Sequence, residues 1–179
     1  MNKDVNRREQ IIFKQDFDKN SGDKFDAEYK RLREAENKSN NPQEWWEKQS
    51  ALYNQYYVGG IRRFEHLSLD QLMQLIKEGF IDPFDHYNCS PTVDEFRKFV
   101  KGIKEYVAEN PDFTSDDFDI YFIGYAVEPA RPDYRVTIEG VVYHSQYKVD
   151  REIMMRFMKF AESADELDCN DTDGRAWWD

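Results

Sequence analysis

The pattern of apolar residues is most regular in the second half of the chain. Three short runs rich in β-branched and aromatic side chains, at 120–127, 134–139 and 141–147, predict three strands. Residues 149–167 then repeat apolar side chains every three or four positions, which predicts an amphipathic helix. The pattern therefore predicts an antiparallel meander over 119–147, with the helix following it.

The second of these runs has a simple alternation. Apolar residues at the even positions of 134–139 alternate with polar residues at the odd positions, so this strand is expected to bury one face and expose the other. Glu139 and Gly140 fit a tight hairpin turn, which would separate this strand from the third. We expect the meander to be the scaffold on which the other segments pack.

Two helices with clear end signals precede the strands. Ser68 and Gln71 form a capping box at the start of the first helix, and Gly79 ends it. The second helix is opened by Ser90–Pro91 and continues with apolar residues at helical spacing. Gly102 lies inside this second helix, where a glycine indicates a close approach of a neighbouring element.

Residues 1–60 predict helices and no strand. Helical spacing covers 4–19 and 23–37, and a third helix is expected to run from Asn41 to a pair of glycines. We therefore divide the chain into this helical N-terminal extension and an α+β domain over 61–179. The predicted fold class is α+β, with N-terminal helices, a helix–loop–helix, a three-stranded antiparallel meander, a C-terminal helix and an acidic tail.

Charge is distributed unevenly along the chain, which has a formal net charge of -11. Residues 1–66 contain 13 lysines and arginines against 12 acidic residues, whereas residues 67–179 contain 12 against 24. An acidic surface repels nucleic-acid phosphates and attracts basic protein surfaces. This favours binding to a protein that itself binds nucleic acid, and the alternative is that the charge serves solubility alone.

Membrane and secretory signals are missing from the sequence. No run approaches the 18 apolar residues of a membrane span, and the polar N-terminus lacks the apolar core of a secretory signal. A cytoplasmic protein is therefore expected. Cys89 and Cys169 are far apart in sequence, and free thiols are expected in a reducing cytoplasm, with a disulfide as the alternative.

Candidate catalytic groups are few. His66, His86 and His144 lack the spacing typical of metal ligands, and there is no nucleophile-elbow motif, although a triad assembled in space stays open. Asp133 and Glu139 resemble the acidic half of a metal-dependent nuclease site, but the lysine that this chemistry needs is missing two residues after the glutamate, where Val141 stands. We predict no enzyme, no metal and no cofactor, and keep the hydrolase as a minor alternative.

Aromatic residues are frequent, with 11 Tyr, 13 Phe and 4 Trp. One interpretation is an interface in which aromatic anchors, ringed by acids, meet a basic partner. For the C-terminal Trp pair, the favoured interpretation is that the tail folds back and its rings cover the open face of the sheet, and the interface is the alternative. The predicted partner-binding residues are Asp112, Asp116, Asp117, Asp119, Asp171, Asp173, Trp177, Trp178, Trp46 and Tyr57.

Several stretches resemble small proteins carried by mobile elements and phages of gut Firmicutes. They are Leu69-Asp70-Gln71-Leu72, Glu78-Gly79-Phe80, the segment from Asp82-Pro83 to Ser90-Pro91-Thr92, residues 133–140 and the terminal Trp177-Trp178-Asp179. The resemblance covers roughly the last two thirds of the chain. Size, acidity and the missing catalytic signature make the chain look like an anti-CRISPR protein.

This resemblance implies an inhibitor of a type II RNA-guided DNA nuclease, acting in the cytoplasm of a bacterial host. Such an inhibitor would occupy a basic nucleic-acid channel or a PAM-reading surface, and the channel is positively charged because it holds a heteroduplex. The lysines and arginines of the N-terminal helices are a second candidate surface, for contact with guide RNA. The alternative is an accessory or regulatory protein of a mobile element with no role in host defence.

Overall fold

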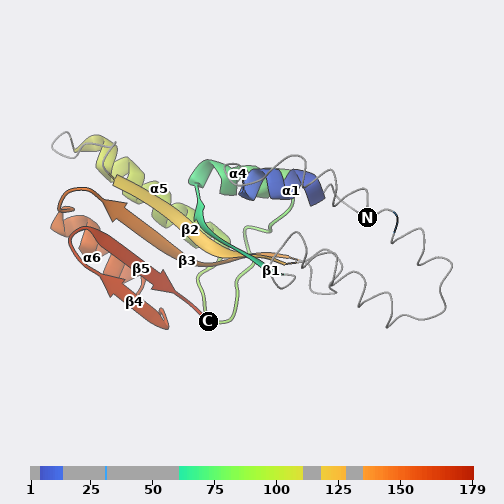
Figure 1. Ribbon diagram of the computed structural model, residues 1–179. Helices are drawn as coiled ribbons and strands as arrows, with labels where there is room; N and C mark the ends of the chain where they lie inside the picture. Colours follow the sequence, from blue (N-terminus) through green and yellow to red (C-terminus); the bar gives the residue numbers. More distant parts are fainter. Residues whose placement is uncertain (1–4, 14–30, 32–60, 111–117, 128–134) are drawn as a thin grey trace. The chain divides into compact units, whose positions relative to one another are not determined.

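The computed structural model describes residues 5–13, 31, 61–110, 118–127 and 135–179 (Figure 1). Within these residues the elements are α1 (Val5–Ile12), β1 (Ile61–Leu67), α4 (Leu69–Glu78), α5 (Val93–Glu109), β2 (Phe118–Val127), β3 (Val136–Ser145), α6 (Arg151–Phe160), β4 (Glu166–Cys169) and β5 (Asp173–Trp177). Helices combined with an antiparallel sheet confirm the α+β class. Apart from residue 31, the helices predicted over 23–37 and from Asn41 lie outside the described residues.

The chain divides into two compact units, one of residues 1–63 and 125–136 and the other of residues 64–124 and 137–179. The predicted boundary at residue 60 stays a prediction, because most of the extension lies outside the described residues.

In the first unit, helix α1 has a buried ion pair. The Arg8 guanidinium bonds to the carboxylate of Glu9, and its Nη1 donates to the carbonyl of Val127 at 3.0 Å. The Arg62 guanidinium carbon lies 3.5 Å from the centroid of the Phe13 ring. The second unit contains α4, α5, α6 and the β4–β5 hairpin.

The two helices before the strands form where their end signals predict. The Ser68 hydroxyl accepts from the Gln71 amide at 3.2 Å, and the Gln71 side chain accepts from the Ser68 amide at 2.8 Å, which confirms the capping box of α4. Gly79 ends α4 with a left-handed φ of 74°. Helix α5 begins two residues later than Ser90–Pro91 suggested, because Thr92 is its cap and Glu95 completes a second capping box.

Gly102, in the middle of α5, does not mark a close approach. A side chain added there would meet nothing within 4 Å, so this expectation was wrong. The space beside Gly102 is open, so the glycine is not needed to let another element pack closely against α5.

The sheet is longer and wider than the predicted meander. The described strands form one five-stranded sheet in the order β1-β2-β3-β5-β4. Strand β3 runs without a turn through Glu139 and Gly140, so the predicted hairpin there and the separate third strand were wrong. Gly140 lies opposite Trp177 in the β3–β5 pair, which the sequence reading did not anticipate.

Strand β3 is also buried on both faces, not on one. Residues 136–141 are all buried, including the polar Thr137 and Glu139 at 7% and 4% exposure. The sequence alternates apolar and polar residues here, but the polar side chains are buried as well, so the alternation does not mark a solvent-exposed face.

Helix α6 is shorter than predicted, and the acidic tail is a β-hairpin. The helix ends at Phe160 rather than at residue 167, and Leu167 belongs to β4 with 45% of its surface exposed. Strands β4 and β5 pair antiparallel, with Glu166 opposite Trp177 and Cys169 opposite Gly174.

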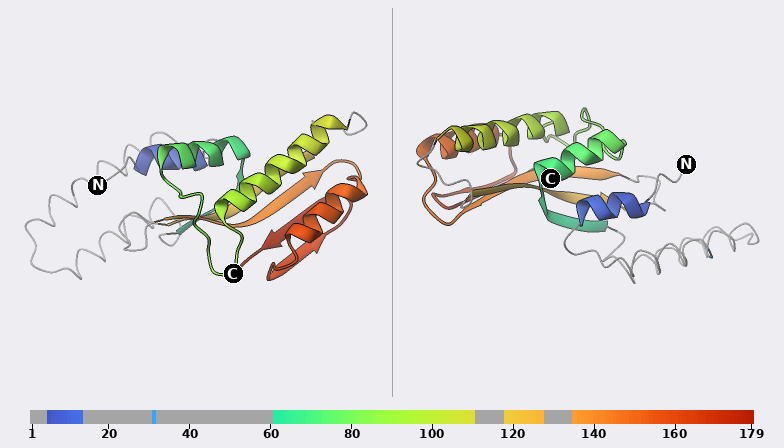
Figure 2. Two further views of the ribbon diagram at one scale, coloured as in Figure 1. Left: turned by 180° about the vertical axis from the view of Figure 1, so that it is seen from behind. Right: turned by 90° about the horizontal axis from the view of Figure 1, so that it is seen from above.

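Aromatic rings fill the space between the sheet and its helices. Figure 2 shows α5 and α6 over one face of the sheet. Trp178 is fully buried, with its ring centroid 5.3 Å from that of Phe96 on α5 and 5.9 Å from that of Phe160 on α6. The Phe160 ring stacks on that of Phe99 at 4.0 Å, and the Tyr143 ring of β3 lies edge-on to Phe157 at 5.0 Å. The C-terminal residues thus join α5 and α6 to the sheet.

Candidate functional site

The β4–β5 hairpin carries the most concentrated negative charge among the described residues. Residues 165–179 contain six carboxylate side chains and one arginine. The hairpin turn forms because the Asn170 side-chain oxygen accepts from the amides of Thr172 and Asp173, each at 2.9 Å. The turn therefore fixes a short acidic hairpin at the edge of the sheet.

Near this turn, Asp171 and Asp173 have side-chain partners. The Lys148 ammonium lies 2.7 Å from Asp171 and lowers the pKa of that carboxyl below 3.8. Hydrogen bonds from His144, at 2.6 Å, and from Thr172 likewise lower the pKa of Asp173. Lys148 therefore offsets part of the negative charge at the turn.

At the other end of the hairpin the acids are held differently. Asp165 accepts from the backbone amide of Asp179 at 2.8 Å, and Asp179 accepts from the Trp177 indole at 2.8 Å. Glu166 bonds to Arg175, whereas Asp168 has no ion pair within the described part of the chain. The carboxylates of residues 165, 166 and 179 lie at this end, and Asp168 lies in the middle of the hairpin opposite Arg175; all four are exposed, and we call them the acidic end.

An exposed phenylalanine lies on the loop between α4 and α5. Phe84 exposes 79% of its surface, the largest fraction of any large apolar side chain that the structure describes. Its neighbours Asp82 and Asp85 are exposed as well. An apolar ring surrounded by water and flanked by carboxylates is typical of an anchor for a partner protein.

The loop that carries Phe84 is held by hydrogen bonds at both ends. The Phe84 amide donates to the Asp82 carboxylate at 2.9 Å, and the Asp94 amide donates to the Pro83 carbonyl at 2.9 Å. The amide of Val93 also donates to the carbonyl of Asp85 at 2.9 Å. The loop is therefore tied to the first turn of α5, and the ring is presented on a fixed backbone.

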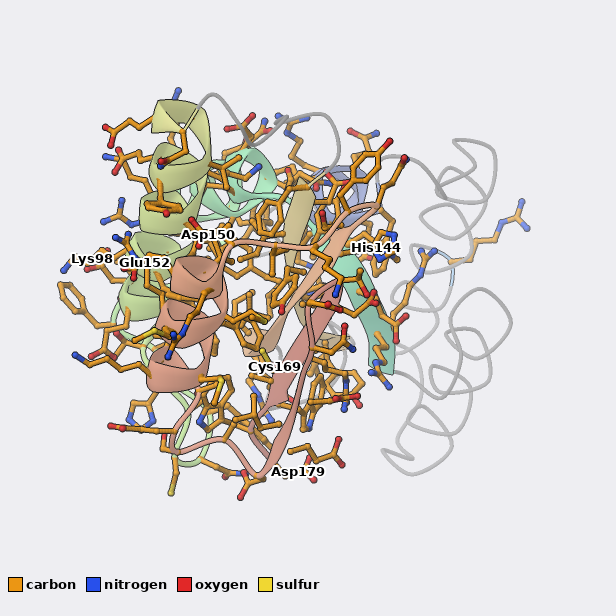
Figure 3. The ribbon with its side chains drawn as sticks, turned by 90° about the vertical axis from the view of Figure 1, so that its left-hand side faces the viewer. Lys98, His144, Asp150, Glu152, Cys169 and Asp179 are labelled. Carbon is orange, nitrogen blue, oxygen red and sulfur yellow. The ribbon has the colours of Figure 1, made fainter. Side chains whose placement is uncertain are left out.

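Phe84 and the acidic end lie at the same end of the second unit. The contact between Phe96, near the start of α5, and Trp178, next to the C-terminus, brings these segments together. Figures 1 and 2 show the α4–α5 loop passing close to the C-terminus. Figure 3 places Asp179 at the far end of the hairpin from His144, with Cys169 between them and Lys98, Asp150 and Glu152 on the helix side.

The predicted partner-binding residues have mixed outcomes. Asp112, Asp116, Asp117, Trp46 and Tyr57 lie outside the described residues, and Asp119 is exposed near the start of β2. Asp171 and Asp173 lie at the hairpin turn.

Trp177 and Trp178 expose 5% and 0% of their surfaces, so neither ring is available as an anchor in this structure. This burial corrects the anchor assignment, because Trp177 is the last residue of β5 and Trp178, the residue after it, packs in the core against Phe96 and Phe160.

The candidate catalytic residues do not assemble into a site among the described residues. His66 lies edge-on to the Tyr121 ring, the His86 ring nitrogen contacts the Asn88 carbonyl, and His144 bonds to Asp173. No group of three metal-ligating side chains is present in the described ranges.

The hydrolase alternative rests on Asp133 and Glu139. Asp133 lies outside the described residues. Glu139 is buried and accepts from the Thr137 hydroxyl. This burial gives the hydrolase alternative no support.

Both cysteines are free, as expected. Cys89 is exposed, and the Cys169 sulfur lies 3.4 Å from the Tyr143 hydroxyl, which donates to the Asn170 carbonyl. Burial and the neighbouring thiol raise the pKa of Tyr143, so its hydroxyl stays a proton donor.

Sequence reasoning missed Phe84, and it counted the acidic tail in the candidate binding surface without predicting that the tail forms a hairpin. The expected helix over 149–167 placed residues 165 and 166 in its last turn, and hid the hairpin that exposes them. A signal for Phe84 was present, since it follows Asp82-Pro83 in a turn-forming loop where no apolar face is predicted.

No helix among the described residues is long and apolar enough to span a membrane. Comparison of the chain with protein-family models, with curated proteins and with solved structures finds no match.

Proposed function

We propose that this protein is a non-enzymatic binding protein that inhibits a type II RNA-guided DNA nuclease by occupying its basic nucleic-acid-binding surface. The observation that carries the proposal is Phe84, an exposed ring on a hydrogen-bonded loop, at the same end of the second unit as the acidic end of the hairpin. The anchor role expected of the terminal tryptophans thus passes to Phe84.

The two features supply different parts of a binding reaction. Carboxylates at the acidic end attract a basic partner and raise the rate of encounter. Phe84 supplies apolar contact, and its fixed loop loses little conformational entropy on binding. A surface of this composition fits an apolar pocket rimmed by lysines and arginines.

The choice of nuclease follows from chemistry and from the resemblance to mobile-element proteins. Nucleases of this class hold their heteroduplex in a positively charged channel, which an acidic protein can occupy in place of nucleic acid. Contact of the N-terminal lysines and arginines with guide RNA would add a second surface, on residues that lie outside the described part of the chain.

The test is target-DNA cleavage by purified type II nucleases loaded with guide RNA, with the full chain added at increasing concentration. The wild-type protein should inhibit at least one of them stoichiometrically. Phe84→Ala should weaken inhibition by about tenfold or more, as expected for an interface anchor. Tyr147→Ala is the matched control, because Tyr147 is also an exposed aromatic at 66% and belongs to the β3–α6 loop.

The charge component is tested with the double variant Glu166→Gln/Asp168→Asn. Its matched control is Glu105→Gln/Glu109→Gln, which removes the same charge from exposed positions of α5. Inhibition should weaken only in the hairpin variant. Inhibition that survives both Phe84→Ala and the hairpin variant would contradict the assigned surface, and failure to inhibit any such nuclease would contradict the proposal itself.

A further inference from the structure

Strand β4 forms the outer edge of the sheet within the described part of the chain. The Asn170 amide donates to the Asp173 carbonyl at 2.8 Å, so the backbone of residue 170 faces β5. Because strand residues alternate in direction, Asp168 and Glu166 also face β5. The amides and carbonyls of Leu167 and Cys169 therefore point outward, where an added strand would pair.

The two faces of β4 differ in chemistry. Tyr143 contacts Phe157 of α6 and lies opposite Gly174, which in turn lies opposite Cys169, so the side chain of Cys169 is on the helix-covered face. Leu167, two residues away, shares that face. Glu166 and Asp168 point to the other face and carry the charge.

Helix α6 adds apolar surface beside this edge. The Arg156 guanidinium lies 4.6 Å from the centroid of the Tyr106 ring, so this side of α6 faces α5. Met158 follows two residues later, about 200° around the helix, and therefore points away from α5. Because α6 also packs on β4, Met158 lies toward the β4 edge of the sheet. The Met158 side chain is 52% exposed and that of Leu167 is 45% exposed.

From this geometry we infer that the outer edge of β4 receives a partner strand in which basic and apolar residues alternate. Side chains opposite Glu166 and Asp168 are lysine or arginine. Side chains opposite Leu167 and Cys169 are apolar and lie beside Met158. Backbone hydrogen bonds to residues 167 and 169 fix the register, and the alternation supplies selectivity.

A second copy of this chain does not fit the edge. Pairing two β4 strands would place carboxylates of one copy beside carboxylates of the other, and like charges on neighbouring strands are destabilising. The inference rests on the proposed function, which requires the partner to be basic. It adds that the partner binds by pairing a strand with β4.

The test uses an eight-residue synthetic peptide of alternating lysine and valine, at low ionic strength. Two control peptides separate the contributions. One carries N-methyl groups on the backbone nitrogens of its valines, the residues expected to lie opposite residues 167 and 169. This peptide keeps every charge and side chain but loses the amide hydrogens that would pair with the edge of β4. The other replaces lysine with glutamate. Binding is followed by backbone NMR of the full chain, together with hydrogen exchange of the Leu167 and Cys169 amides.

We expect the lysine–valine peptide to bind and to protect the amides of Leu167 and Cys169. N-methylation should weaken binding by about tenfold or more, because the paired amides are lost. Glu166→Gln/Asp168→Asn should weaken binding as well, whereas Glu105→Gln/Glu109→Gln should not. The glutamate–valine peptide should not bind.

Three outcomes would overturn the inference. Equal binding of the N-methylated peptide would show attraction by charge without strand pairing, and would leave the proposed function standing. Protection of residues 167 and 169 that rises with protein concentration and needs no peptide would show self-association. Absence of lysine–valine binding, together with nuclease inhibition that still depends on Glu166 and Asp168, would also reject strand pairing and retain the proposed function.

Discussion

Gly174 lies directly opposite Tyr143, whose fully buried ring occupies the space that a side chain at position 174 would need. A Cβ atom built on Gly174 would lie 2.0 Å from a carbon of that ring. Gly102 presents the reverse case, since a Cβ there meets nothing within 4 Å. Position 174 therefore requires a glycine, whereas position 102 has room for a side chain.

The first prediction compares these glycines. Gly174→Ala should lower the free energy of unfolding by about 1–3 kcal/mol, because the buried ring must shift to relieve the overlap. Gly102→Ala should raise it by about 0.5–1 kcal/mol, since alanine favours a helix interior. Urea denaturation of both variants measures the difference. Equal stability of the two variants would contradict the packing described for β3 and β5.

The second prediction concerns one hydrogen bond between α5 and Asp150, the N-cap residue of α6. The Tyr106 hydroxyl donates to Asp150 at 2.6 Å and, with the Glu152 amide, holds the pKa of Asp150 below 3.8. Since the folded-state pKa is depressed, the stability from this carboxylate is present above pH 3.8 and is lost as pH falls through the folded value. Tyr106→Phe should raise the pKa of Asp150 toward 3.8 in a carboxyl NMR titration.

Asp171 is the internal control for this titration. Its pKa is lowered by Lys148 rather than by Tyr106, so it should titrate identically in the wild type and in Tyr106→Phe. An unchanged Asp150 titration in the variant would mean that the backbone amides alone hold the carboxylate.

At the scale of elements, the β4–β5 hairpin determines how the second unit is closed. It pairs with β3 along Gly140–His144 and places Trp178 between α5 and α6. The residues that looked like a solvated tail are therefore structural. Loss of the hairpin would expose the ring cluster that joins both helices to the sheet.

The third prediction tests that structural role. Trp178→Ala should lower the free energy of unfolding by about 3–5 kcal/mol, as truncation of a fully buried aromatic does. Phe84→Ala, at a position 79% exposed, should change it by no more than about 0.5 kcal/mol. Thermal and chemical denaturation compare the two. Unchanged stability of Trp178→Ala would restore the view of this residue as an exposed anchor.

The same elements explain what the sequence could and could not predict. Helices α4 and α5 were predictable because their caps are local: Ser68 with Gln71, and Thr92 with Glu95. Strands β1 and β5 were missed because β1 pairs with β2 and β5 with β3, which are distant in sequence, and β4 was missed with them. Leu167 continues the helical period of α6 by coincidence, and this concealed the hairpin and hence the acidic end.

At the scale of the whole molecule, acidic charge is separated by element. Helix α5 contains four basic and four acidic residues, and α6 contains three basic residues and one acidic residue. Residues 165–179 contain six acidic residues and one basic residue. The net charge of -11 therefore acts on a partner mainly through surfaces such as the hairpin, not through α5 and α6.

The last prediction follows from this separation. Attraction between the hairpin and a basic nuclease surface is screened as salt shortens the Debye length from about 10 Å at 0.1 M. The association rate should therefore fall by about tenfold or more between roughly 0.05 and 0.5 M salt. Glu166→Gln/Asp168→Asn should reduce this salt dependence, and Glu105→Gln/Glu109→Gln should leave it unchanged. Surface plasmon resonance with the guide-loaded nuclease measures the rates, and equal salt dependence in both variants would place the electrostatic contact elsewhere on the chain.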